Sequence, residues 1–103
     1  MLPQSDNGLK KCSPELEVAL QNGSKLAANL MREIEYGQTK LQETKEKYSY
    51  ATIYAPKTAD AYLNLILQWD DYLRQRIKQA NDLFTSYENA KETCNTSVEF
   101  PKK

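Results

Sequence analysis

The thiols of Cys12 and Cys94 are the two side chains of this sequence that could react with each other. With only two cysteines, a single intramolecular disulfide is possible. Closing a loop of about 80 residues would stabilise the fold by roughly 4–4.5 kcal/mol in the chain-entropy model. The alternative is two unrelated buried thiols in a cytosolic protein. A disulfide would indicate an oxidising compartment, so the position of the two cysteines in the fold decides between secretion and the cytosol.

Residues that catalysis or metal binding would require are scarce. There is no histidine, and two cysteines alone supply too few soft ligands for zinc. The acid pairs Glu33/Glu35 and Asp70/Asp71 diverge around a helix, which is typical of solvated faces rather than of an acid–base dyad. A glycine-rich phosphate loop is missing as well. We therefore expect no enzymatic activity, no metal and no cofactor.

Two Asn-X-Ser/Thr triplets, at Asn22 and Asn95, could accept N-linked glycans in a eukaryotic secretory pathway. The first overlaps Gly23 and can equally mark a break in a helix. Residues 1–6 lack the apolar core of a signal peptide. The extracellular assignment therefore depends mainly on the cysteines.

Composition indicates one small domain with modest apolar surface. The chain has 103 residues, of which 40% are hydrophobic and 3 are glycine, and its mean hydropathy is −0.77. A domain of this size needs a crosslink or a partner to supplement its core. The 14 basic and 14 acidic residues cancel, without the basic stripe typical of nucleic-acid binding. No apolar run is long enough to span a membrane.

Periodic apolar residues predict a first long helix. Ser13 can cap its N-terminus, and Pro14 suits the first turn, where a missing N–H costs nothing. A break or kink would fall at Asn22-Gly23, so the helix is either one rod or two collinear pieces, and we expect Gly37 to allow a close approach of a partner helix. The apolar face recurs at three- and four-residue spacing over about nine turns, through Leu16, Leu20, Gly23, Ala27, Leu30, Ile34, Gly37, Leu41, Thr44 and Tyr48.

A second long helix follows Pro56, because the residue before a proline disfavours helix and closes the connection. It should run to about Thr93. Trp69 is expected to be a buried anchor on its stripe, whereas Tyr72 lies off it. The stripe contains Tyr62, Ile66, Trp69, Leu73, Ile77, Ala80, Phe84, Tyr87 and Cys94.

Two helices of about 36 residues, roughly 54 Å each, must lie antiparallel when a short turn joins them. This brings Cys94 back to Cys12. We therefore predict an all-α antiparallel hairpin over residues 1–103, closed by one disulfide, with flexible tails at 1–11 and 96–103. A bare pair of helices leaves half of each stripe uncovered. The chain could form a four-helix bundle through a break in the first helix, form one by dimerising, or keep a stripe for a partner.

The tip of the hairpin is rich in tyrosine. Tyr48, Tyr50, Ile53, Tyr54 and Lys57 could line a partner-binding surface, since tyrosine gives a large contact area at low entropic cost. Alternatively, these rings cap the end of the hairpin's own core. Tyr50 and Tyr54 are the best candidates for exposure. The segment 98–101 either docks on the bundle or supplies a contact peptide.

The chain resembles the small anopheline mosquito salivary proteins typified by albicin and anophensin. The resemblance rests on Cys12-Ser-Pro-Glu-Leu, on Tyr54-Ala-Pro-Lys-Thr-Ala-Asp-Ala-Tyr62 and on Cys94 after a long polar helix, and it spans about residues 10–95. It implies an antagonist of host defence during blood feeding. Albicin-like members block the alternative complement pathway at the C3 convertase, the complex of C3b with Bb. Anophensin-like members block contact-phase activation and kinin release.

The leading expectation is a secreted salivary inhibitor of the alternative complement pathway that binds the C3 convertase without a cofactor. The alternatives are an inhibitor of contact-phase coagulation and kinin activation, a small-ligand carrier, and a bacterial periplasmic helical adaptor. The expected partner is a host plasma protein, and a homodimer is a further option. Neither nucleic acid nor a membrane is expected as a partner.

Overall fold

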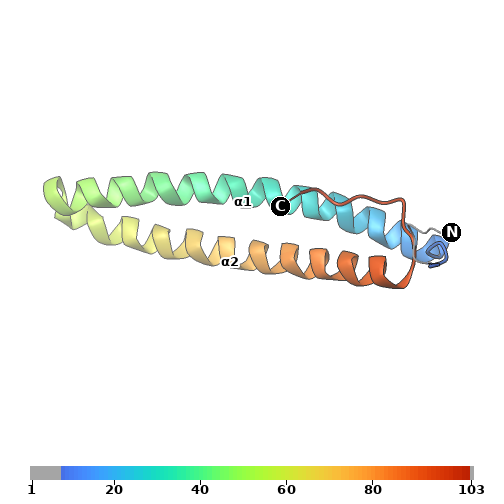
Figure 1. Ribbon diagram of the computed structural model, residues 1–103. Helices are drawn as coiled ribbons and strands as arrows, with labels where there is room; N and C mark the ends of the chain where they lie inside the picture. Colours follow the sequence, from blue (N-terminus) through green and yellow to red (C-terminus); the bar gives the residue numbers. More distant parts are fainter. Residues whose placement is uncertain (1–7, 103) are drawn as a thin grey trace. The chain divides into compact units, whose positions relative to one another are not determined.

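Two long α-helices, α1 (Pro14–Tyr54) and α2 (Pro56–Thr93), make up most of the computed structural model, which describes residues 8–102 (Figure 1). The helices run antiparallel, and a disulfide joins Cys12 to Cys94. Residues 8–102 contain no β-strand, only an isolated bridge between Lys11 and Asn95. The predicted all-α hairpin closed by one disulfide is confirmed.

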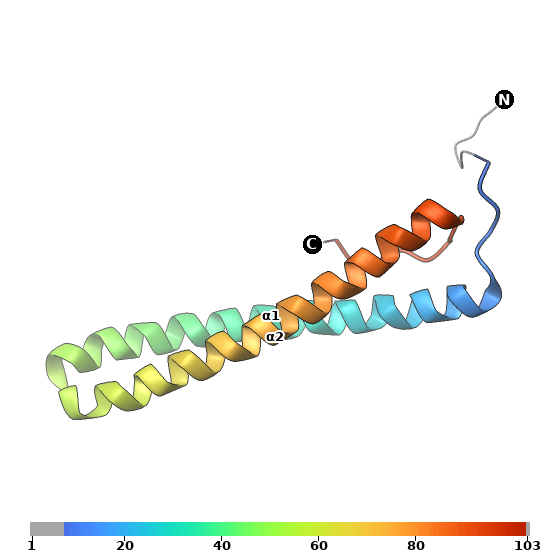
Figure 2. The same cartoon turned by 90° about the horizontal axis from the view of Figure 1, so that it is seen from below.

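Local chemistry sets the start of α1 and the reversal of the chain. Ser13 Oγ accepts a hydrogen bond from the Leu16 N–H at 3.2 Å, as an N-cap does. At the other end, only Ala55 separates the helices, and Pro56 is the first residue of α2 (Figure 2). The Ala55 carbonyl accepts the first backbone hydrogen bond of α2, from the Thr58 N–H at 2.9 Å. The connection is therefore a single residue, and α1, with 41 residues, is longer than the predicted 36 or so.

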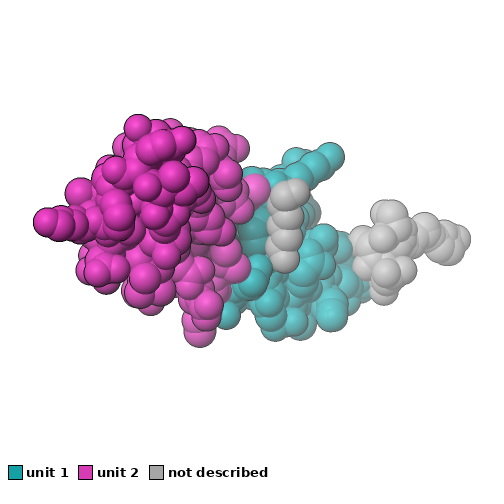
Figure 3. All heavy atoms as spheres, turned by 90° about the vertical axis from the view of Figure 1, so that its left-hand side faces the viewer, with its two compact units in different colours: residues 1–30, 79–103 teal, residues 31–78 magenta. Residues whose placement is uncertain are grey.

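The chain divides into two compact units, residues 1–30 with 79–103 (unit 1) and residues 31–78 (unit 2) (Figure 3). Of the two alternatives for the first helix, the single rod is confirmed, because α1 is continuous through Asn22-Gly23. A Cβ on Gly23 would lie only 3.1 Å from Cζ of Phe100, so the small residue makes room for that ring. Ser24 Oγ also donates a hydrogen bond to the Glu99 carbonyl at 2.7 Å. A four-helix bundle formed through a break in α1 is excluded.

The C-terminal segment is part of unit 1 and packs against both of its helices, so the expectation of a flexible tail is wrong for residues 96–102. Val98 is buried in a small core with Leu20 and Ala90. The Phe100 ring stacks on that of Tyr87, with the centroids 4.3 Å apart, and the Tyr87 hydroxyl donates to the Val98 carbonyl at 3.0 Å. The docking alternative for residues 98–101 is confirmed.

The expected N-terminal tail is also partly held. Asn95 donates hydrogen bonds to the carbonyls of Lys10, from its backbone N–H at 2.8 Å, and of Leu9, from its side chain at 2.8 Å. Residues 1–7 of that tail lie outside the described residues. The segments before α1 and after α2 are thus joined in two ways, by the disulfide and by the hydrogen bonds of Asn95 next to it.

In unit 2, α1 and α2 approach closely at Gly37, as predicted. A Cβ there would lie 2.8 Å from Cδ2 of Leu73 and 3.0 Å from the Tyr72 ring. The predicted apolar row on α2 is not buried along its whole length. Ile77 is 41% exposed, and half-buried Arg76 packs over the Tyr72 ring instead, 3.6 Å from its centroid.

Removal of the disulfide should destabilise the protein strongly. We expect the double variant Cys12→Ala/Cys94→Ala to lose about 4 kcal/mol of unfolding free energy in urea, because a loop spanning 82 residues is no longer closed in the unfolded chain. The double variant leaves no free thiol to react. If the midpoint and the slope of urea unfolding are the same with and without the disulfide, the disulfide does not stabilise the fold.

The Glu17 carboxylate holds the C-terminal segment in place. It accepts hydrogen bonds from the Thr96 hydroxyl and from the Ser97 N–H, the latter at 3.2 Å. These donors favour the charged form and lower the pKa of Glu17 below its ordinary value. Since the folded-state pKa lies below that of the unfolded chain, the stabilisation is present at neutral pH. It is lost as the pH falls through the folded-state pKa.

We expect the Thr96→Val variant to raise the pKa of Glu17 back toward its ordinary value, because the first of its donors is removed. The measurement is a pH titration of the Glu17 carboxyl carbon by NMR. Thr39→Val is the control, since the Thr39 hydroxyl donates to a backbone carbonyl, that of Glu35. A Glu17 that titrates at an ordinary pKa in the unmodified protein would refute the proposed contact.

Candidate protein-binding surface

Three apolar or aromatic side chains on the last two turns of α1 form an exposed surface, here called the tip patch: Tyr50, Ile53 and Tyr54. They are 63%, 70% and 69% exposed, respectively. The Tyr50 and Tyr54 rings lie side by side, with centroids 4.6 Å apart. Three large side chains so open to solvent at one place are typical of an interaction site.

Helix periodicity explains why these side chains point outward. Tyr50 and Tyr54 are four residues apart and so share one face of α1. Ala51 lies between them in sequence, about 100° further around the helix, and is buried. Because α1 continues to Tyr54, the tip patch belongs to regular helix and not to a loop. The expectation that these rings cap the hairpin's own core is wrong for all three tip-patch residues, and the predicted exposure of Tyr50 and Tyr54 is confirmed.

The two other predicted contact residues, Tyr48 and Lys57, differ in their exposure to solvent. Tyr48 is half-buried and continues the α1 row that packs toward α2, after buried Thr44. Lys57 is exposed on the first turn of α2, two residues beyond Ala55. Lys57 can therefore contribute a positive charge at the rim, whereas Tyr48 supports the fold.

A groove of about 400 Å³ lies beside the tip patch in unit 2. Tyr50 forms part of its wall, together with Ala51 and Tyr62. Glu46 and Lys47 bring opposite charges to the same groove. An extended side chain of a partner that binds the tip patch could enter it.

Sequence reasoning missed a second aromatic surface in unit 2. The Trp69 ring lies between those of Tyr36 and Tyr72, in edge-to-face contacts at 5.9 Å and 5.3 Å. Trp69 is thus half-buried rather than a fully buried anchor, and Tyr36 is largely exposed. Arg76, over the Tyr72 ring, also forms an ion pair with Glu33 at 3.1 Å. The contact between Tyr36 and Trp69 joins different helices, so spacing within one helix could not reveal it.

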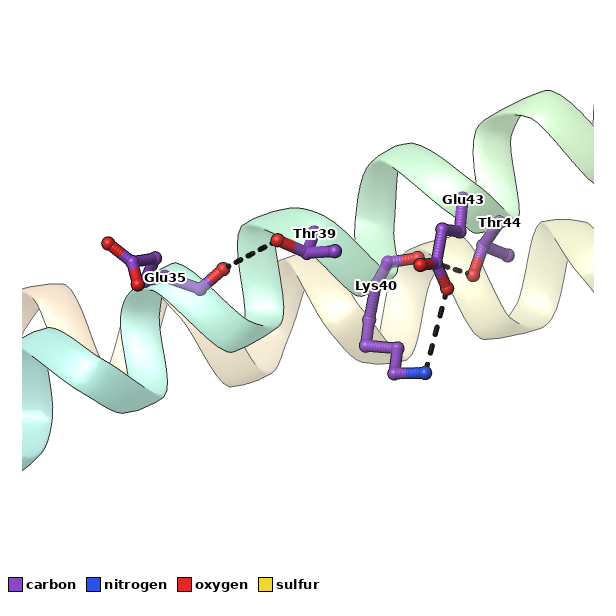
Figure 4. A network of polar contacts seen from close by, with 5 residues as sticks. All are labelled: Glu35, Thr39, Lys40, Glu43 and Thr44. Atoms are coloured by element: carbon purple, nitrogen blue, oxygen red, sulfur yellow. Dashed lines mark hydrogen bonds and ion pairs between the residues drawn. The ribbon is translucent and has the colours of Figure 1, made fainter.

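Figure 4 shows a series of polar contacts along α1, between Glu35 and Thr44. Lys40 forms an ion pair with Glu43 at 3.5 Å and lies over the Tyr36 ring, 5.6 Å from its centroid. The buried hydroxyl of Thr44 donates to the Lys40 carbonyl at 2.7 Å, which satisfies it within its own helix. The polar contacts in Figure 4 therefore join residues three or four apart on α1 and stabilise that helix.

The two possible glycan acceptors differ in their surroundings. Asn22 is exposed on α1 in unit 1. Asn95 is half-buried, and its side-chain nitrogen already donates to the Leu9 carbonyl. A glycan on Asn22 would project into solvent, whereas one on Asn95 would crowd the closure of unit 1.

Two classes of site find no support among residues 8–102. No group of three or more acidic, cysteine or histidine side chains in this range is placed to hold a metal ion. Neither described helix contains a stretch long and apolar enough to cross a membrane.

Comparison with protein-family models, with curated proteins and with solved structures finds no match to this chain.

Proposed function

We propose that this chain is a secreted, non-catalytic inhibitor that binds a host plasma protein through the tip patch. The proposed target is the C3 convertase of the alternative complement pathway, the complex of C3b with Bb. The observation that carries the proposal is the exposure of Tyr50, Ile53 and Tyr54 on regular helix. The resemblance of the sequence to albicin-like salivary proteins supplies the target.

The chemistry of the tip patch suits binding to a protein surface. Tyrosine offers a broad apolar face with a hydroxyl at its edge, and it contributes strongly at the centres of protein interfaces. A patch on helix is already ordered, so association costs little backbone entropy. Lys57 and the charged wall of the neighbouring groove add polar contacts at the rim.

The Cys12–Cys94 disulfide supports the extracellular part of the proposal. Structural disulfides persist in oxidising compartments and are rare in the cytosol. A protein that works in blood plasma benefits from a crosslink, because its thin core alone gives limited stability.

We expect the protein to inhibit lysis of rabbit erythrocytes by the alternative pathway in human serum. The triple variant Tyr50→Ser/Ile53→Ser/Tyr54→Ser should raise the concentration for half-inhibition by at least about 30-fold, as the loss of a binding hot spot would. The control variant, Val18→Ser/Leu26→Ser, removes exposed apolar side chains of α1 in unit 1 and should inhibit like the unmodified protein. Circular dichroism checks that both variants remain helical.

The results of these assays test the proposed target and the proposed binding surface separately. Unimpaired lysis together with a prolonged activated partial thromboplastin time would replace the convertase by contact-phase proteins. A triple variant that inhibits lysis at full strength would show that the tip patch is not the binding surface. If the unmodified protein affects neither assay, the proposed function is wrong.

A further inference from the structure

A row of five side chains, four of them exposed and Asp70 half-buried, follows one face of α2 within unit 2. We call it the α2 stripe: Leu63, Leu67, Asp70, Arg74 and Ile77. Its apolar members are uncovered, with Leu67 60% exposed and Leu63 40% exposed. The stripe is not part of the tip patch, which lies on α1, nor of the aromatic surface around Trp69. A partner that covered Leu63 and Leu67 would enlarge the buried apolar surface of α2.

The spacing within the α2 stripe is that of a coiled-coil seam. Successive members are four, three, four and three residues apart, an average of 3.5. That period keeps a row of side chains facing a second helix laid alongside at a small crossing angle. Its centre is polar, since Arg74 Nε forms an ion pair with Asp70 Oδ2 at 2.7 Å.

Four members of the α2 stripe, Leu67, Asp70, Arg74 and Ile77, form a pattern that is complementary to its own reverse. Leu67 and Ile77 lie five positions on either side of residue 72, and Asp70 and Arg74 lie two positions on either side. An antiparallel copy of the helix, related by a two-fold axis at residue 72, therefore places Leu67 opposite Ile77, whereas Leu63 falls opposite Asn81 and takes no part in this match. It also places each carboxylate opposite a guanidinium. A two-fold interface requires this self-complementarity.

We propose that the α2 stripe binds the α2 stripe of a second copy of this chain in antiparallel orientation. Leu67 of one copy packs against Ile77 of the other. Asp70 faces Arg74 of the second copy on both sides of the axis, which gives a network of two acidic and two basic groups. The zero net charge of the chain adds no long-range repulsion between copies.

The charge pattern disfavours other pairings. In a parallel pair in register, Asp70 would face Asp70 and Arg74 would face Arg74, and like charges opposite one another weaken an interface. An unrelated partner helix would have no reason to match a pattern with mirror symmetry about residue 72. A second copy of this chain carries the matching pattern because its sequence is the same.

Sedimentation equilibrium of the intact, disulfide-bonded protein tests the proposal. We expect a mass of twice 11.9 kDa, which returns to 11.9 kDa on dilution. Asp70→Arg and Arg74→Asp should each raise the dimer dissociation constant at least about 100-fold, because like charges then face each other. An equimolar mixture of the two variants should form a mixed dimer, since every facing pair is again opposite in charge.

The mixed dimer shows that the variants do not lose dimerisation because they misfold. Misfolded chains would not associate again when the two variants are combined. A Leu26→Glu variant, which alters an exposed leucine of α1 in unit 1, is the matched control and should dimerise normally. A spin label at Asp60→Cys distinguishes orientation. The antiparallel pair separates two labels by about 36 Å along the axis, whereas a parallel pair brings them together.

Three results would overturn the proposal. The unmodified protein could remain at 11.9 kDa up to about 1 mM, where even weak pairs associate. The two charge variants could dimerise as well as the unmodified protein, which would place any dimer contact elsewhere. Finally, the mixture could fail to associate while each variant remains helical by circular dichroism.

Discussion

Within each unit, α1 can bury only the face that it turns toward α2 and, in unit 1, the positions that the C-terminal segment covers, because residues 8–102 contain no third helix. The buried positions are accordingly few and mostly small, with alanine at several of them. Small residues let the two backbones approach and raise the number of contacts that each remaining side chain makes. Gly37, packed against Leu73 and Tyr72, is the extreme case. A narrow core of this kind leaves most of both helices in water, and the surfaces left outside it are where binding can occur.

Much of the framework follows from local chemistry and chain topology. The start of α1 at Pro14 depends on a cap one residue earlier, and the reversal depends on a proline that cannot continue a helix. Two helices of similar length then place Cys12 and Cys94 together without any knowledge of packing. These features could be predicted because each depends on neighbours in sequence or on the length of a regular helix.

Features that depend on distant neighbours could not be predicted in this way. Gly23 resembles a helix break until the Phe100 ring, far along the chain, is seen to pack against it. The same C-terminal segment looks polar and mobile in sequence, yet Glu17 holds it through hydrogen bonds. Periodicity identified the face of α1 that packs on α2, but not how little covers the last turns. The exposure of Tyr50 and Tyr54 therefore became certain only with the three-dimensional arrangement.

The one-residue connection at Ala55 has a consequence for how this protein can change over generations. Because helix continues to Tyr54, residues near the reversal keep a fixed spacing whatever side chains they carry, so long as these tolerate a helix. Substitutions at solvent-facing positions usually alter stability little. The outer surface of the last turns can thus diversify freely while the scaffold stays constant.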